Sequence, residues 1–155
     1  MLSNHIHTLC EAKHADALSR GVQGLEVRIA RGINKALGRS GRVFADRYHS
    51  RALKTPCEVR ACLVYVFQNR LHHLGAAATR GLWFDPFSSA PWFDGWKEPL
   101  PTDEPWMREA RLEPPCVAPA HCWLLTTGWR GRKGSLSLAA RPAGAARDAE
   151  HRGSR

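Results

Sequence analysis

Two segments of this chain repeat apolar residues in steps of three and four, which is the spacing of an amphipathic helix. The first covers residues 16–37, and its apolar side chains are Leu18, Val22, Leu25, Ile29, Ile33 and Leu37. Asp16 stands where an N-cap is expected, because its carboxylate can accept hydrogen bonds from the first backbone N–H groups. The glycines inside this segment each cost about 1 kcal/mol of helix stability relative to alanine. Packing must therefore hold the helix.

The second segment covers residues 55–74 and starts with a strong capping signal. Thr55 can cap the helix, Pro56 suits its first position, and Glu58 completes a capping box. Between the two helices, residues 42–53 are expected to form a loop that leads into a short strand.

The two sides of the second helix differ in character. At roughly 100° per residue, one side collects Val59, Leu63, Val66, Phe67, Arg70 and Leu74. Tyr65, Asn69 and His72 fall on nearly the opposite side. A tyrosine that serves only packing would be expected among the apolar side chains, so the position of Tyr65 favours another role.

The amino terminus carries two histidines on either side of one bulky apolar residue, in the order His5-Ile6-His7. Residues 5–11 alternate well enough to predict a strand, and side chains two apart on a strand point to the same face. By itself such a pair is weak evidence for a metal site, because surface histidines are common. The simpler interpretation is a pair of solvated side chains.

Tyr65 and Asn69 widen the possible chemistry, because residues four apart share one face of a helix. With His5 and His7 they would provide two nitrogen ligands, one amide oxygen and one phenol nucleophile. This combination suits a metal-dependent enzyme that attacks phosphodiesters through tyrosine. Each residue taken singly has an ordinary explanation as a surface side chain.

The positive charge of the chain is concentrated in its first half. The whole chain has 23 Lys+Arg against 14 Asp+Glu, a formal charge of +9. Residues 1–80 hold 13 basic and 5 acidic side chains, and residues 81–155 hold 10 and 9. A concentrated positive field indicates a polyanionic partner such as nucleic acid. The alternative is a basic surface that only keeps the protein soluble.

A dense basic stretch lies between the two predicted helices. It contains Arg39, Arg42, Arg47, Arg51 and Lys54 around two aromatic residues, Phe44 and Tyr48. Cations neutralise a nucleic-acid backbone and aromatic rings stack on bases, so this stretch, with Tyr48, is the predicted DNA-binding surface. The alternative is that the aromatic residues anchor the loop and the arginines are only solvated.

The cysteines and the hydropathy bear on the cellular compartment. The five cysteines show no Cys-x-x-Cys pair and no zinc-ligand spacing. They therefore favour a reducing compartment. No apolar run approaches the ~18 residues of a membrane span, and the first residues do not resemble a signal peptide. We expect a cytoplasmic protein without a membrane partner.

The second half of the chain changes in composition. Residues 81–115 hold four of the six tryptophans and seven of the ten prolines. We expect an irregular arm over residues 81–130, packed on a first domain that covers residues 1–80. From residue 131 onward Gly, Arg, Ala and Ser dominate, which predicts a disordered tail over residues 131–155.

Several stretches resemble the HUH single-tyrosine transposases, where U is a bulky apolar residue, and in particular the REP-associated tyrosine transposase branch. Residues 3–7 (SNHIH) are similar to the metal-binding strand of that family. The other similar stretches are 18–21 (LSRG), 23–25 (QGL), 41–48 (GRVFADRY), 51–53 (RAL), 63–69 (LVYVFQN) and 85–96 (DPFSSAPWFDGW). The resemblance extends over about residues 1–130.

The resemblance implies an α+β, ferredoxin-like HUH endonuclease fold and a specific chemistry. His5, His7 and Asn69 would be ligands of a divalent metal, Mg²⁺ or Mn²⁺, and Tyr65 would be the nucleophile. The tyrosine would take the 5′ phosphate of single-stranded DNA, beside a small hairpin, and leave a free 3′ hydroxyl. The chain would thus be a DNA strand transferase, acting as a monomer or homodimer.

One departure from the family concerns the amino terminus. In the family a strand, a helix and another strand precede the histidine strand, whereas only four residues precede His5 here. The ferredoxin-like fold would then be incomplete, lacking the first strand, the first helix and most of the second strand. An unpaired central strand leaves backbone groups without partners. We therefore expect a truncated, poorly folded and weakly active or inactive copy.

Two other functions remain open on the sequence. A non-catalytic basic DNA-binding module would keep the positive surface without turnover. A basic interaction protein with no role at DNA is the third possibility.

Overall fold

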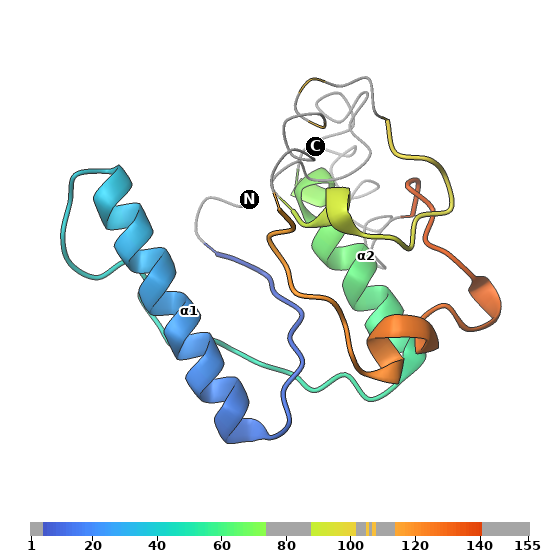
Figure 1. Cartoon of the computed structure of the whole chain (residues 1–155), viewed down its shortest axis with the longest axis horizontal. Coiled ribbons are helices and arrows are strands. Elements are labelled where there is room, and N and C mark those ends of the chain that lie inside the picture. The colour runs from blue at the N-terminus through green and yellow to red at the C-terminus, as the bar shows by residue number, and fades with distance from the viewer. Residues whose placement is uncertain (1–4, 74–87, 102–104, 106, 108–113, 141–155) are drawn as a thin grey trace, which may run out of the picture. The chain divides into compact units, whose positions relative to one another are not determined.

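The computed structural model describes residues 5–73, 88–101, 105, 107 and 114–140, with residues 69–73 described by their backbone alone. The chain divides into two compact units, one formed by residues 10–52 and the other by residues 1–9 together with 53–155. In chain order (Figure 1), the elements are α1 (Ala15–Ala36), α2 (Pro56–His73), η1 (Ala90–Trp92), η2 (Leu124–Gly128) and η3 (Gly131–Lys133). None of the helices in these ranges combines the length and apolarity needed to cross a bilayer.

Helix α1 confirms the first predicted helix, but its N-cap differs from the prediction. Nδ1 of His14 accepts a hydrogen bond from the backbone N–H of Ala17 at 3.2 Å, so His14 is the cap. The prediction of Asp16 as the cap is wrong, because Asp16 already lies within the first turn. A carboxylate there still favours the helix through its dipole. No residue of α1 is buried, so its apolar side chains are only half-covered or exposed.

Helix α2 confirms the second predicted helix and its capping box. The backbone N–H of Glu58 donates to Oγ1 of Thr55 at 3.2 Å, and the N–H of Thr55 donates to Oε2 of Glu58 at 3.0 Å. These reciprocal bonds satisfy two donors that a helix start otherwise leaves unpaired. The N–H of Lys54 donates to the same carboxylate oxygen at 2.8 Å.

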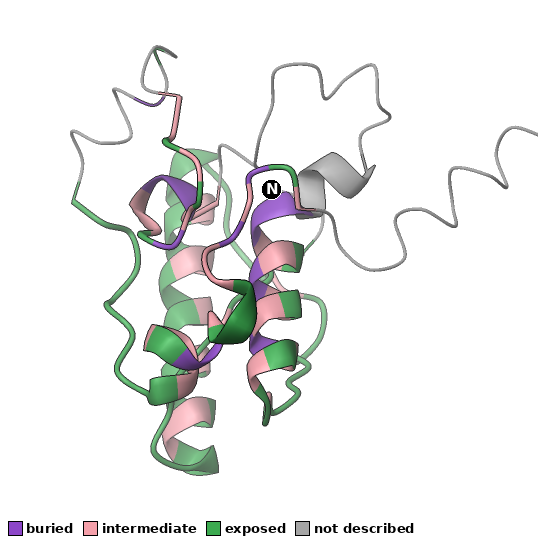
Figure 2. Cartoon of the chain, turned by 90° about the vertical axis from the view of Figure 1, so that its right-hand side faces the viewer, coloured by how far each residue is buried: buried purple, intermediate pink, exposed green. Residues whose placement is uncertain are grey.

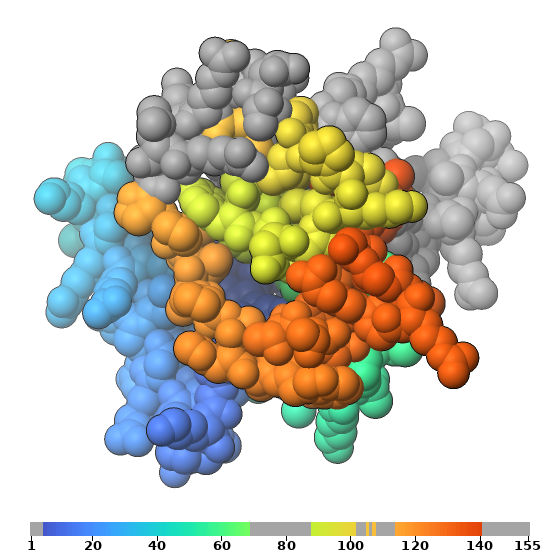
Figure 3. All heavy atoms as spheres, turned by 45° about the vertical axis from the view of Figure 1, so that its right-hand side comes forward, coloured from blue at the N-terminus to red at the C-terminus, as the bar shows by residue number. Residues whose placement is uncertain are grey.

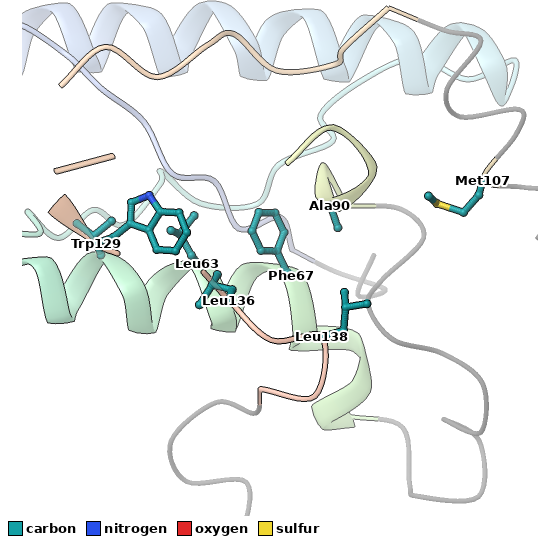
Figure 4. Close-up of a cluster of buried hydrophobic side chains, with 8 residues drawn as sticks. Leu63, Phe67, Ala90, Met107, Trp129, Leu136 and Leu138 are labelled. Carbon is teal, nitrogen blue, oxygen red and sulfur yellow. The ribbon is translucent and has the colours of Figure 1, made fainter. Parts of the chain in front are cut away.

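One side of α2 forms the centre of the hydrophobic core. Val59, Leu63 and Phe67 are buried and recur in steps of four, and Figure 2 shows this buried side along the helix. The buried residues that pack with them are Ala90, Met107, Trp129, Leu136 and Leu138 (Figure 4). The apolar side of the second predicted helix is thus confirmed at these three positions, and buried residues of the second half of the chain pack on it.

The chain after η3 is bound to the core, which corrects the predicted tail. Leu136 forms an isolated parallel β-bridge with Trp96. The N–H of Leu136 donates to the carbonyl of Gly95 at 2.8 Å, and the N–H of Lys97 donates to the carbonyl of Leu136 at 2.8 Å. In Figure 3 the segments around these residues adjoin. The prediction that the disordered tail begins at 131 is therefore wrong, and its remainder, 141–155, lies outside the described residues.

Two side chains of α2 hold this same segment, residues 134–138, which we call the strap. The guanidinium of Arg60 donates to the carbonyls of Gly134 at 2.5 Å and Ser135 at 3.0 Å. The amide of Gln68 donates to the carbonyl of Leu138 at 2.8 Å. Leu136 and Leu138 are two positions apart and both are buried. These two apolar side chains within a Gly/Arg/Ala/Ser-rich stretch explain why the strap packs, whereas a purely polar tail would not.

The predicted strand at residues 5–11 is absent from the structure as a paired strand. In the described ranges the only β pairing is the isolated bridge between Trp96 and Leu136, and residues 5–12 are irregular. A strand requires a neighbour that satisfies its backbone N–H and C=O groups, and residues 5–12 take part in no strand pairing within the described ranges. The short strand expected within 42–53 is also not formed. The ferredoxin-like sheet remains a prediction.

Candidate functional site

Tyr65 lies on the side of α2 that faces away from the buried core. Its side chain is 37% exposed, whereas Val59, Leu63 and Phe67 on the other side are buried. This agrees with the expectation that Tyr65 does not serve packing. A phenol that is accessible and mounted on a rigid helix can meet a substrate from solution.

His7 lies against Tyr65, although the two residues are 58 positions apart. Oη of Tyr65 is 3.3 Å from Nε2 of His7, and the ring centroids are 4.9 Å apart with an angle of 74° between the planes. The phenol donates if Nε2 is unprotonated, and the phenol oxygen accepts if Nε2 carries the proton. At 3.3 Å the hydrogen bond is long for a hydroxyl group, so it can tighten or yield when a substrate enters.

His5 completes a row of three rings. Its ring centroid is 4.7 Å from that of His7, with an angle of 79° between the planes. The prediction that His5 and His7 lie on the same side is confirmed, because their rings are in edge-to-face contact. Residues two apart share a side in any extended segment, so the arrangement persists without a strand. Both histidines are exposed.

Asn69 belongs to α2 and follows Tyr65 by one turn of the helix. Its side chain lies outside the described residues, so its predicted role as the third metal ligand stays a prediction. Across the described ranges no group of three or more His, Cys, Asp or Glu side chains could hold a metal ion. Any metal ion at this site would therefore depend on the two imidazoles, the Asn69 amide, and oxygen atoms from substrate or water.

The chemistry of these ligands fits one of the two predicted ions better. Imidazole nitrogens suit transition metals, whereas Mg²⁺ prefers oxygen atoms. The rings of His5 and His7 are in edge-to-face contact, and Nε2 of His7 reaches Oη of Tyr65. A site built on two imidazoles would accordingly suit Mn²⁺ better than Mg²⁺.

Arg39 and Arg42, two members of the predicted DNA-binding surface, shape their own loop. Arg39 donates from Nη2 to the carbonyl of Arg42 at 2.9 Å. Arg42 donates from Nε to the carbonyl of Phe44 at 2.6 Å, and from Nη2 to the carbonyl of Ala45. Their guanidinium groups therefore satisfy backbone carbonyls and remain exposed to solvent. Both functions, folding the loop and presenting positive charge, are compatible.

The other members of this predicted surface are exposed. Arg47, Tyr48 and Arg51 lie on the surface of the unit formed by residues 10–52. Tyr48 is 37% exposed and Phe44 is half-buried. Tyr48 can accordingly stack on a base, whereas Phe44 serves the loop at least in part. Lys54 is exposed as well but belongs to the unit that contains α2.

Sequence reasoning missed two polar residues of α2, Arg60 and Gln68, that bind the strap. Gln68 is 1% exposed and follows Tyr65 by three positions on α2. Arg60, on the same helix, donates to the carbonyl of Gly134 in the strap. A single glutamine between Phe67 and Asn69 gives no signal of burial, because its partner is 70 positions away. Both residues fix the strap, and the strap holds the buried side of the helix that carries Tyr65.

No family model matches this chain, and no curated protein or solved structure matches it either. A functional assignment must therefore come from the residues and their geometry.

Proposed function

We propose that this chain is a transposase-like DNA strand transferase of the HUH single-tyrosine type, in which Tyr65 is the nucleophile. The observation that supports this most directly is the distance of 3.3 Å between Oη of Tyr65 and Nε2 of His7. The resemblance of residues 3–7 and 63–69 to the family's motifs adds to it. The substrate is single-stranded DNA beside a hairpin, and the compartment is the cytoplasm.

The reaction is a transesterification at phosphorus. Oη of Tyr65 attacks the scissile phosphate, a Tyr–O–P bond forms, and the bond from phosphorus to the 3′ oxygen breaks. The phenol gives up its proton, and the leaving 3′ oxygen takes one up and becomes a hydroxyl group. The phosphotyrosine keeps the energy of the broken ester, so a 3′ hydroxyl can attack it and rejoin the strand without ATP. No oxidation or reduction takes place.

The side chains around Tyr65 have separate roles in this proposal. His7 orients the phenol through its ring contact and the 3.3 Å hydrogen bond. His5, His7 and Asn69 would hold the divalent ion. When bound, such an ion acts as a Lewis acid on a phosphate oxygen and orients the phosphate for attack.

The charge distribution supports a nucleic-acid substrate. Residues 1–80 hold 13 basic against 5 acidic side chains, and Arg47, Arg51 and Lys54 are exposed. Such a field raises the local concentration of a polyanion and speeds its association. Tyr48, which is exposed beside these residues in the sequence, offers a ring for base stacking.

A second candidate function is a non-catalytic basic DNA-binding module. One observation favours it: the histidine pair sits on an irregular segment, since residues 5–12 form no paired strand. Catalytic ligands need a rigid support to keep their geometry within about 0.5 Å. Under this reading the positive surface binds DNA and Tyr65 forms no covalent bond.

The two tyrosines of this chain allow a matched test. Tyr65 and Tyr48 are both 37% exposed, so replacing either by Phe perturbs the fold little. The purified chain is incubated with Mn²⁺ and a labelled single strand that carries a hairpin, and covalent adducts are detected on a denaturing gel. The strand transferase predicts an adduct in the wild type and in Tyr48→Phe but none in Tyr65→Phe.

Other results separate the candidates. An adduct that persists in Tyr65→Phe would contradict the assignment of the nucleophile. Salt-dependent binding of the oligonucleotide without any adduct in the wild type would favour the DNA-binding module. The absence of both would leave only an interaction protein with no role at DNA.

A further inference from the structure

Among the tryptophans that the structure describes, Trp123 is the most exposed. It is 64% exposed, whereas Trp129, six positions later, is 2% exposed and belongs to the core. The ring of Trp123 lies against Gly128: a Cβ atom added there would be 2.9 Å from two of its ring carbons. One part of the indole is thus supported by bare backbone, and most of it remains open to solvent.

The support beneath Trp123 is firmly attached to the core. Trp123 is the N-cap residue of η2, a π-helical turn. Leu124 and Leu125 of this turn pack against the buried cluster. Directly after it, Nε1 of buried Trp129 donates to the carbonyl of Leu125 at 3.0 Å. An aromatic side chain on such a base costs little entropy when it binds a flat ligand.

The surroundings of Trp123 in the sequence are purely basic. Residues 114–140 contain no Asp or Glu, and they contain Arg130, Arg132 and Lys133. Arg130 lies over the ring of Trp129 at 4.7 Å and pairs with Asp94 at 3.7 Å. Arg132 and Lys133 lie in η3, three positions beyond η2, and are exposed. The turn pair η2–η3 thus combines one open aromatic ring with two exposed cations.

We propose that Trp123, Arg132 and Lys133 form a contact site for single-stranded nucleic acid. A base stacks on the Trp123 indole, and the neighbouring phosphates lie near Arg132 and Lys133. Aromatic rings that stack on bases, together with cations that contact the backbone phosphates, are how proteins bind single strands with little sequence preference. The site goes beyond the proposed function, since it needs neither Tyr65 nor a metal ion.

The test measures binding of a fluorescently labelled oligo-dT by anisotropy, using the full chain without metal. Trp123→Ala should weaken binding about tenfold, the value of one stacked base. Trp123→Phe should retain most of the affinity, because a ring remains. Trp123→Leu should lose it as Ala does, because leucine is apolar but cannot stack. Val117→Ala, which removes another exposed apolar side chain (48%), should leave binding unchanged.

The charge part of the site has its own measurement. Replacing both Arg132 and Lys133 by Gln should lower the slope of log K against log salt by about 1.4, the value for two phosphate contacts with a single strand. Lys97→Gln removes one exposed positive charge elsewhere on the same unit and should change binding less than Lys133→Gln. Thermal melting of each variant checks that the fold is kept.

Three results would overturn the proposal. Trp123→Ala could bind oligo-dT as tightly as the wild type. Trp123→Leu could bind as tightly as Trp123→Phe, which would indicate an apolar docking surface for a protein. Binding to anionic vesicles, rather than to oligo-dT, could depend on Trp123, which would indicate a membrane contact. A covalent adduct at Tyr65 is unaffected by any of these, so the two proposals fail independently.

Discussion

The side-chain amide of Gln68 donates a hydrogen bond to the backbone carbonyl of Leu138 at 2.8 Å, across 70 positions of sequence. Gln68 is 1% exposed and is the only buried polar side chain among the described residues. It lies on the helix that carries Tyr65, and Leu138 ends the strap that covers that helix. The bond therefore joins the second half of the chain to the element on which the candidate nucleophile stands.

Replacing Gln68 by Ala should destabilise the unit that contains α2 by about 1–3 kcal/mol. The substitution removes the donor, leaves the Leu138 carbonyl without this partner, and opens space in a buried position. The measurement is the free energy of unfolding from denaturant titration. Gln23→Ala, the same change at an exposed position of α1, is the control and should cost less than about 0.5 kcal/mol. Equal effects at both positions would contradict the role of the buried bond.

Two glycine-to-alanine variants should change stability in opposite directions. A Cβ atom at Gly95 would lie 2.6 Å from the ring of Trp129, so Gly95→Ala should cost about 1–3 kcal/mol through overpacking. A Cβ atom at Gly24, inside α1, would meet nothing within 4 Å. Gly24→Ala should therefore stabilise the helix by up to about 1 kcal/mol. The midpoints of chemical unfolding, with helicity by circular dichroism, test both signs.

The two helices could be predicted from sequence because their signals are local. The capping box of Thr55 and Glu58 requires residues three positions apart, and it forms as predicted. The periodicity of α1 and α2 likewise lies within each segment. The wrong cap at Asp16 shows the limit of this reasoning. The helix is capped at His14, two residues earlier, where the backbone is extended. Histidine is not among the preferred cap residues, so no local signal indicated it.

The strap and the site depend on contacts between residues far apart, which local patterns do not contain. Arg60 reaches Gly134 across 74 positions, so composition alone assigned that segment to a tail. The side shared by His5 and His7 follows from alternation, and the exposed side of Tyr65 from helical periodicity. The contact between Nε2 of His7 and Oη of Tyr65 at 3.3 Å depends on the tertiary structure. The strand predicted at 5–11 is not formed in the described ranges. Alternation belongs to the segment alone, whereas a strand also needs a neighbouring strand, which alternation does not encode.

The stability at low pH of the unit that contains α2 should depend on Glu98. The backbone N–H of Leu138 and the hydroxyl of Ser137 donate to its carboxylate, both at 2.8 Å, and hold the pKa of Glu98 below its ordinary value. A lowered pKa means that the stabilisation is complete above the unfolded-state value of about 4.3 and is lost as pH falls through the lower folded value. Glu98→Gln should therefore be less stable than the wild type at pH 7, and this difference should shrink below about pH 4.3.

Unfolding midpoints at pH 7 and pH 3 for both proteins provide this measurement. Ser137→Ala should show the same trend with a smaller difference, because one of the two donors remains. Asp46→Asn, on the exposed loop of the other unit, controls for the general loss of a negative charge. A difference between wild type and Glu98→Gln that grows toward low pH would contradict the assignment.

Metal binding should depend on the two histidines that meet beside Tyr65. His5→Ala and His7→Ala should each weaken binding of Mn²⁺ at least about tenfold, because each removes one of two nitrogen ligands. His49→Ala, at an exposed histidine of the other unit, should have no effect. Calorimetric titration with Mn²⁺ at pH 7.5 gives the affinities, and addition of EDTA should remove both the heat and any covalent adduct at Tyr65. Mn²⁺ affinity that is the same in all three variants would place the ion elsewhere and leave the His7–Tyr65 contact with an orienting role only.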